Sequence, residues 1–115
     1  MKNIEELTNL VRKFRDDRDW KQFHNPKDCA LSLVLEAAEV MEHFQWKSKE
    51  EIESYIKTNK QEIGEELADV LYWVLLLSYD LEIDLSAAFV DKLEKSGKKY
   101  PIEKSKGSNK KYTQL

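Results

Sequence analysis

Apolar residues recur along residues 3 to 19 with the spacing of an amphipathic helix. They stand at Ile4, Leu7, Leu10, Val11 and Phe14. Such spacing leaves one apolar face along the helix. The segment from 19 to 27 has no regular period, and within it Asn25 followed by Pro26 is typical of a helix cap with proline at the first helical position. A second helix is therefore predicted from Pro26 to about His43.

This second helix is apolar on nearly every side. Its apolar residues are Leu31, Leu33, Val34, Leu35, Ala37, Ala38, Val40 and Met41. A helix without a polar face is normally buried, so we expect it to lie in the interior. The single cysteine, Cys29, precedes this run and is expected to pack in the core, since it has no second cysteine to pair with.

A third helical region is predicted to begin at Ser48, where Glu51 three residues later completes a capping box. The polar residues at 58–59 predict a break or bend, after which the helix continues over about 60–81. The middle of this stretch, residues 67–77, is again apolar all round.

The last helix is predicted to begin at Asp84 and to end at Gly97, a residue typical of helix C-caps. Residues 98–115 then form a polar, basic, extended tail. With three glycines and two prolines in 115 residues, the chain favours long helices. We expect one all-α domain over residues 1–115, a bundle of four to five helices with an extended C-terminal tail.

Composition narrows the function classes. The net charge of -3 gives no general attraction to nucleic acid or to anionic membranes. No run approaches the roughly 18 apolar residues of a membrane span, and the first residues lack a signal-peptide core. A lone cysteine fits a reducing compartment. We therefore expect a cytoplasmic protein with no membrane association and no stable nucleic-acid partner.

Acidic residues inside the two most apolar helices are the informative anomaly. Glu36 and Glu39 stand three residues apart, which places them on one helix face, and Glu66 and Asp69 repeat this spacing on the later helix. Acids at this spacing often form only a solvated face. Within apolar helices, however, unpaired carboxylates are costly to bury and are usually neutralised, paired or bound to a metal.

Facing acids on two packed helices, whose axes lie about 8–10 Å apart, converge on a shared cation. All-oxygen ligation favours magnesium, with manganese as a substitute, over iron or zinc. Neither His24 nor His43 follows a glutamate by three residues, so the Glu-x-x-His pattern of di-iron bundles is absent.

Aromatic residues next to the second helix are candidates for holding a nucleobase. They are Trp20, Phe23, Phe44 and Trp46, and Trp73 lies one turn beyond Asp69. An aromatic slot stacks on a base, while a few polar groups select its edge. His24 is either such an edge reader or a residue that fixes its loop, and Trp73 is either a pocket wall or a core residue.

At these residues the sequence resembles a known family. Glu36-Ala-Ala-Glu39 and, 26 residues later, Glu66-Leu-Ala-Asp69 are similar to the ExxE…ExxD signature of the MazG-like all-α nucleotide pyrophosphohydrolases. Within them the chain most resembles the dCTP pyrophosphatase branch. The supporting segments are Arg18-Asp-Trp-Lys-Gln-Phe-His24, Pro26-Lys27, Phe44-Gln-Trp-Lys-Ser48, Lys92, Tyr100-Pro101 and Gly107-Ser-Asn-Lys-Lys-Tyr112.

The resemblance implies hydrolysis of a nucleoside triphosphate between its α- and β-phosphates, with magnesium held by the two acid pairs. It also implies a homo-oligomer, a dimer or commonly a tetramer. The candidate substrate-binding residues are Trp20, His24, Lys27, Trp46, Trp73, Lys92, Ser96, Tyr100 and Lys111, and among the basic and tail residues the resemblance favours Lys92, Tyr100 and Lys111. The chain departs from the branch at two positions, since Asp28 and Ser96 each stand where the branch usually has asparagine.

In the expected reaction, water attacks the α-phosphorus and one of the four acids accepts its proton, with Glu36 or Glu39 preferred. The preferred base, expected to be cytosine or a modified cytosine, and the number of metals stay open. The excess of apolar surface predicts association through Leu71, Val74 and Leu75. The alternative to an enzyme is a non-catalytic helical metal-binding or protein-interaction module.

Overall fold

The computed structural model describes all residues from Met1 to Leu115, and every regular element in it is a helix, as the sequence predicted. The chain divides into two compact units, Met1–Glu82 and Ile83–Leu115. None of the helices combines the length and the apolar character that a membrane crossing requires.

Helix α1 spans Ile4–Asp17 and begins with a capping box, in which the Asn3 side chain accepts a hydrogen bond from the Glu6 amide at 2.8 Å. A short 3-10 turn, η1 (Lys21–Phe23), leads to helix α2 (Pro26–Glu42). The Asn25 side chain caps α2 by accepting from the Asp28 amide at 2.9 Å. The predicted start of this helix is therefore confirmed.

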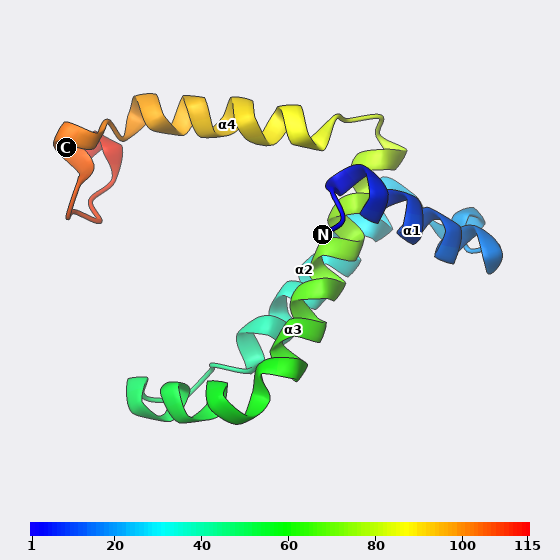
Figure 1. The fold of residues 1–115 in the computed structure, drawn as a ribbon, viewed down its shortest axis with the longest axis horizontal. Coiled ribbons are helices and arrows are strands. Elements are labelled where there is room, and N and C mark those ends of the chain that lie inside the picture. Colours follow the sequence, from blue (N-terminus) through cyan, green and yellow to red (C-terminus); the bar gives the residue numbers. More distant parts are fainter. The chain divides into compact units, whose positions relative to one another are not determined.

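Helix α3 spans Lys49–Asp80 and starts with the predicted capping box of Ser48 and Glu51. It bends at Asn59, whose backbone leaves the helical region with φ -127° and ψ 20°. The Asn59 side chain donates a hydrogen bond to the carbonyl of Tyr55 at 2.9 Å. The predicted break is thus a kink inside one long helix, and the bend is visible in the green part of Figure 1.

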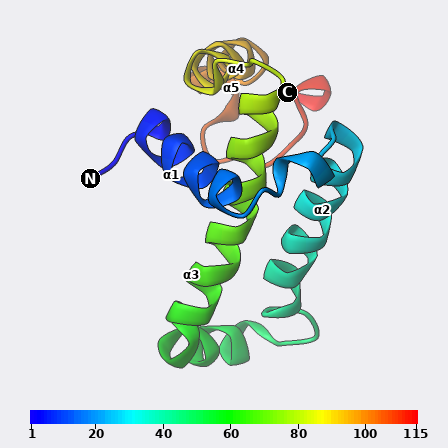
Figure 2. The ribbon, with the colours of Figure 1, turned by 90° about the vertical axis from the view of Figure 1, so that its right-hand side faces the viewer.

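Helix α2 packs along α3, and α1 crosses the second half of α3 (Figure 2). Three apolar side chains are fully buried, those of Cys29, Leu75 and Leu76. The expected packing of Cys29 in the core is confirmed. The arrangement leaves the central stretches of α2 and α3, which carry the two acid pairs, facing each other.

In the second unit, helix α4 spans Leu85–Lys99 and is capped by the Asp84 side chain, which accepts from the Ala87 amide at 3.1 Å. The prediction that this helix ends at Gly97 is wrong. Gly97 does not have the positive φ of a glycine C-cap, and Lys98 and Lys99 add a favourable basic end to the helix dipole. The helix ends before Pro101, which cannot continue it.

The C-terminal tail contains more structure than an extended segment. It forms the short helix α5 (Ile102–Ser105) and the 3-10 turn η2 (Tyr112–Gln114), with Gly107 at φ 77° between them. The rings of Tyr100 and Tyr112 meet edge to face at 6.0 Å, and the Lys99 ammonium lies 4.9 Å from the Tyr112 ring centre. These contacts fold the tail back onto the end of α4.

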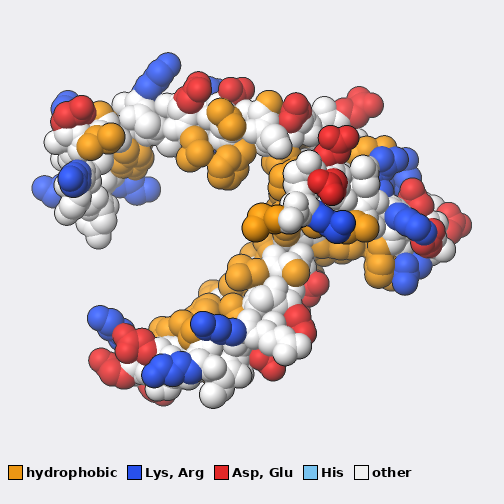
Figure 3. All heavy atoms as spheres, viewed as in Figure 1, with side chains coloured by type: hydrophobic (Ala, Val, Ile, Leu, Met, Phe, Trp, Pro, Cys, Tyr) orange, Lys and Arg blue, Asp and Glu red, His pale blue; other side chains and the backbone are white.

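The expectation that α2 is buried throughout is wrong for the single chain. Cys29 is the only fully buried residue of α2. Large apolar side chains that are at least half exposed lie on α2 at Leu31, Val34, Leu35 and Met41, and on α4 at Phe89, Val90 and Leu93. Figure 3 shows apolar side chains gathered along one face of α4.

The expected association surface on α3 also needs a correction at one residue. Leu75 is 2% exposed and belongs to the chain's own core, whereas Leu71 is 37% exposed and Val74 is partly exposed. The apolar residues left for association are therefore found mainly on α2 and α4.

We predict that the protein elutes as a homo-oligomer, because so many large apolar side chains lie open to solvent in one chain. Light scattering coupled to gel filtration at micromolar concentration should give a multiple of the 13.6 kDa chain mass. Replacing Phe89 and Leu93 together with glutamate should lower that mass if α4 takes part. A strictly monomeric wild-type protein would contradict the prediction.

Candidate active site

The two acid pairs meet between α2 and α3. Glu36 and Glu39 come from α2, and Glu66 and Asp69 come from α3. One carboxylate oxygen of each residue lies within 4.8 Å of those of the other three. The structure therefore brings together the four side chains that the sequence singled out, while their role as metal ligands stays a prediction.

The acids crowd one another. The pKa of Glu66 is raised to about 7 by a hydrogen bond shared with Glu39, by burial, and by the negative charges of Glu39, Asp69 and Glu36. Burial, followed by a hydrogen bond with Glu39 and the charges of Glu39 and Asp69, raises the pKa of Glu36. The cluster is thus a place of concentrated negative charge that favours taking up a cation or protons.

The surroundings provide no basic partner for this charge. None of the ion pairs in the chain includes any of the four acids. One oxygen of Glu36 and one of Glu66, Oε2 in both cases, are buried and have no hydrogen-bond partner. Four convergent carboxylates with unpartnered oxygens are a donor set that suits a hard divalent cation such as magnesium or manganese.

The raised pKa of Glu66 predicts how stability without metal depends on pH. Between the ordinary value of 4.5 and about 7, the folded chain holds a proton on Glu66 that the unfolded chain has released. The stabilisation from this group is therefore complete below pH 4.5 and is lost as the pH rises through 7. In chelator, the melting temperature of wild type should fall relative to that of Glu66→Gln as the pH is raised from 5 to 8.

The comparison with Glu66→Gln matters because His24 acts in the opposite direction. Burial, and then the charge of Arg15, lower the pKa of His24. The contribution of His24 to the stability of the protein is therefore present at high pH and is lost as the pH falls. Its contribution is the same in both proteins and cancels in the difference. Adding magnesium at pH 8 should raise the wild-type melting temperature. A difference between the two proteins that does not change with pH would contradict the prediction.

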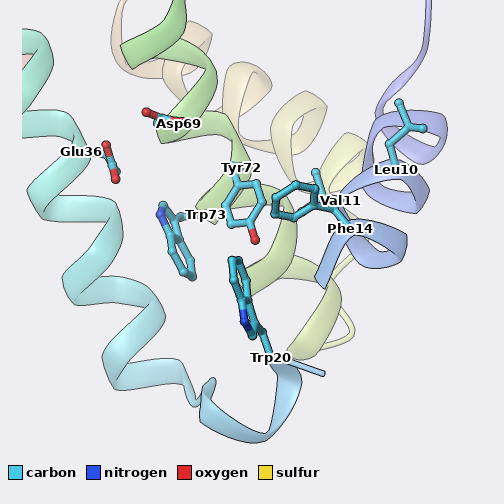
Figure 4. Close-up of a pocket in the computed structure, with 8 residues that line it drawn as sticks. All are labelled: Leu10, Val11, Phe14, Trp20, Glu36, Asp69, Tyr72 and Trp73. Carbon is cyan, nitrogen blue, oxygen red and sulfur yellow. The ribbon is translucent and has the colours of Figure 1, made fainter. Parts of the chain in front are cut away.

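An aromatic pocket of about 470 Å³ opens beside the acids (Figure 4). Its lining residues are Leu10, Val11 and Phe14 of α1, Trp20 of the following turn, Glu36 of α2, and Asp69, Tyr72 and Trp73 of α3. Glu36 and Asp69 therefore belong both to the acid cluster and to this pocket. A cavity of this size and character is suited to a small aromatic ligand.

The rings in the pocket pack edge to face. Phe14 meets Trp20 at 5.8 Å and Tyr72 at 6.2 Å between ring centres, and Tyr72 meets Trp73 at 5.0 Å. Phe14 and Trp20 are each 42% exposed, which leaves aromatic surface open to a ligand. Edge-to-face contacts of this kind hold the rings in a defined arrangement.

On the other side, Glu39 and Glu66 line a more polar hollow of about 420 Å³. Glu42, His43 and Tyr55 complete it, and His43 Nδ1 and the Tyr55 hydroxyl share a hydrogen bond. The acid cluster thus stands between an aromatic cavity and a polar one, and each cavity takes two of the four acids.

Of the aromatic residues predicted to bind substrate, Trp20 and Trp73 line the pocket. His24 does not line it but packs its ring edge to face against Trp73 at 5.3 Å, and its buried Nδ1 has no hydrogen-bond partner. Trp46 lies outside the pocket, is 92% exposed and has a left-handed backbone with φ 67°. Lys27 is exposed in the first turn of α2.

The other predicted substrate residues lie in the second unit. Lys92 and Ser96 are on α4, Tyr100 caps that helix, and Lys111 precedes η2. The backbone carbonyl of Ser96 accepts from the Tyr100 amide at 2.9 Å. The roles of these four residues toward a substrate stay predictions.

Sequence reasoning missed part of the pocket and its support. Leu10, Val11 and Phe14 were interpreted only as a helix face, and nothing in their spacing distinguishes a pocket wall from a core. Tyr72 next to Trp73 was a weak signal for an aromatic wall. Arg15 had no signal at all, although it is the one fully buried charged side chain.

The chain is similar to known proteins over most of its length. The sequence model of the MazG-like family matches residues 31–115. The chain is 37% identical to dCTP pyrophosphatase 1 of Rattus norvegicus over 114 residues, which cover 97% of this chain and 67% of the relative. It is 34% identical to dCTP pyrophosphatase 1 of Homo sapiens over 114 residues, which again cover 97% of this chain and 67% of the relative.

A solved structure extends the similarity to the fold. The crystal structure of a pyrophosphatase from Archaeoglobus fulgidus superimposes with a TM-score of 0.81 at 41% sequence identity. The match covers 88% of this chain and 94% of that one.

Proposed function

The chain belongs to the MazG-like family, and from this premise we propose that it hydrolyses nucleoside triphosphates between the α- and β-phosphates. The products are a nucleoside monophosphate and pyrophosphate. The observation that carries the proposal is that a cluster of four carboxylates directly adjoins an aromatic pocket, with Glu36 and Asp69 shared by both.

The two cavities suggest how the substrate lies. The base stacks in the aromatic pocket, which is apolar and large enough for a single nucleobase. The α-phosphate then falls at the acid cluster, and the outer phosphates extend toward the polar hollow that Glu39 and Glu66 line. This orientation puts the bond between the α- and β-phosphates next to the four acids.

Negative phosphates meeting negative carboxylates require a bridging cation. We propose that Glu36, Glu39, Glu66 and Asp69 hold magnesium, or manganese in its place, through their convergent oxygens. When bound, such an ion neutralises phosphate charge and orients a water for attack. Because a hydrogen bond with Glu39, burial and the neighbouring negative charges raise the pKa of Glu66 to about 7, Glu66 would release its proton when such an ion is bound.

In the proposed reaction, the oxygen of a water attacks the α-phosphorus while the bond to the bridging oxygen of the β-phosphate breaks. Pyrophosphate leaves with the bonding electrons, and the proton of the water passes to a carboxylate. Glu36 and Glu39 are the two candidates for this acceptor. Glu36 faces the aromatic pocket and Glu39 faces the polar hollow, so each borders the site of attack.

We propose dCTP or a modified dCTP as the substrate, since relatives 34–37% identical over nearly the whole chain are named dCTP pyrophosphatase 1. Removing such nucleotides from the precursor pool is the corresponding cellular role. Roles in phosphate binding stay predictions for Lys27, Lys92, Ser96, Tyr100 and Lys111. Contacts to the base are proposed for Trp20 and Trp73, which line the pocket, and stay predictions for His24 and Trp46, which do not line it within one chain.

The test is a panel of canonical and modified deoxynucleoside triphosphates, assayed with magnesium, with manganese and with chelator. Chromatography should detect monophosphate and pyrophosphate in equal amounts, only when a divalent ion is present. Release of orthophosphate would mean that another bond is cleaved. Binding of the ion without any turnover would instead support a non-catalytic metal-binding module.

A further inference from the structure

Arg15, near the end of α1, is the one charged side chain that the fold buries completely, with 1% of its surface exposed. Its guanidinium donates two hydrogen bonds to Asp80 at the end of α3, from Nη1 to Oδ2 at 2.7 Å and from Nη2 to Oδ1 at 2.9 Å. Desolvation offsets much of the attraction in such a pair, and apolar residues in its place often give equal or greater stability. Stability alone is therefore a weak explanation for it.

The backbone of Arg15 holds the turn that presents Trp20. The Arg15 carbonyl accepts hydrogen bonds from the amides of Arg18 and Trp20, both at 3.2 Å. Asp19, between them, has a left-handed backbone with φ 54°, which reverses the chain direction. One residue thus fastens α1 to α3 through its side chain and shapes the Trp20 turn through its carbonyl.

The neighbouring side chains complete the wall of the aromatic pocket. Phe14 precedes Arg15 and packs against Trp20 and against Tyr72 of α3. The Arg18 guanidinium lies over the Phe14 ring at 3.7 Å from its centre. Asp80 follows Tyr72 by about two turns of the same helix. The two hydrogen bonds from Arg15 to Asp80 therefore fix the distance between the pocket wall on α1 and the pocket wall on α3.

We infer that the Arg15–Asp80 pair is a positioning device that holds Phe14, Trp20 and Tyr72 as a nucleoside-binding wall. Neither residue lines the pocket, so the pair acts through those rings. The four acids lie on α2 and α3, and no ion pair of the chain connects them to Arg15 or Asp80. The pair therefore governs nucleoside binding and leaves cation binding unchanged. The identity of the ligand rests on the proposed function.

Two variants separate positioning from simple stability. Arg15→Lys keeps the positive charge but cannot form the two-pronged contact with Asp80. The double variant Arg15→Met with Asp80→Leu removes both charges and fills the space with apolar atoms, which favours a folded protein. The matched control is Lys13→Met, which breaks the exposed ion pair of Lys13 with Asp17 on the same helix.

The primary measurement is calorimetric binding of the α,β-imido analogue of dCTP in magnesium. We expect both test variants to bind it on the order of 10-fold more weakly than wild type and the control to match wild type. With hydrolysable substrate, KM should rise while kcat changes little. Near-ultraviolet circular dichroism of the aromatic rings should weaken, and affinity for magnesium alone should stay within about twofold.

Analogue binding within about twofold of wild type in the folded double variant would show that the pair is only structural. If the double variant does not fold, the same threshold applies to Arg15→Lys. An equal loss of affinity for magnesium would also overturn the inference. If wild type itself binds no nucleotide, the proposed function fails, and the near-ultraviolet signal still decides whether the pair orders the rings.

Discussion

Glu39→Gln is expected to abolish turnover while leaving the helical circular dichroism signal intact. Glu39 is central to the acid cluster, because its carboxyl contributes to the raised pKa of both Glu36 and Glu66. Glutamine has the same shape, but it removes one negative ligand. We expect kcat/KM to fall by about 10³-fold or more, equivalent to about 4 kcal/mol of lost transition-state stabilisation.

The same substitution should also change the apo protein in a recognisable way. Glu39 is the largest cause of the raised pKa of Glu66, so the pKa of Glu66 should return toward its ordinary value in the variant. The matched control is Glu65→Gln, an exposed glutamate beside Glu66 that is not part of the cluster. Activity and magnesium affinity close to wild type in Glu39→Gln would refute its assignment as a metal ligand.

Each half of the acid cluster could be predicted from the sequence because it depends on helix geometry, whereas the meeting of the two halves depends on the packing of α2 on α3. Two residues three apart on a helix share a face, and each pair stands within an apolar stretch that must pack against something. These two facts, together with the oxygen chemistry of carboxylates, bring Glu36 and Glu39 opposite Glu66 and Asp69. The caps at Asn25, Ser48 and Asp84 were predictable for the same reason, because capping is a local interaction.

The aromatic pocket could be predicted only in part because it is a tertiary feature. It requires α1 to cross α3 at the level of Tyr72, and no spacing within α1 encodes where the crossing occurs. Phe14 has the same pattern whether it fills a core or lines a cavity. The crossing is instead fixed by the contact between Arg15 and Asp80, which lie 65 residues apart in the sequence.

The misplaced end of α4 shows a competition between two local signals. Glycine at position 97 favours a C-cap, whereas the following lysines and the proline at 101 favour a later end. In the structure α4 ends at Lys99, as the lysines and the proline favour. The left-handed glycine of this unit is Gly107, with φ 77°, in the tail.

Trp73→Ala is expected to weaken nucleotide binding strongly with a smaller effect on kcat. Trp73 follows Asp69 by one turn, lines the aromatic pocket and packs against both Tyr72 and His24. Base stacking on an aromatic side chain contributes about 1–3 kcal/mol, so KM should rise on the order of 10-fold to 100-fold. Binding of magnesium alone should persist, because the four acids remain in place.

Comparison with other aromatic residues makes this expectation specific. Tyr79→Leu is the matched control on α3, since Tyr79 lies under the Arg12 guanidinium and outside the pocket. Trp46→Ala tests for a contact between two copies of the chain, because Trp46 is 92% exposed and does not line the pocket of its own chain. A rise in KM for Trp46→Ala would mean that Trp46 reaches the pocket of a second copy. An unchanged KM for Trp73→Ala would place the base elsewhere, because stacked aromatic surface cannot be removed without loss of affinity.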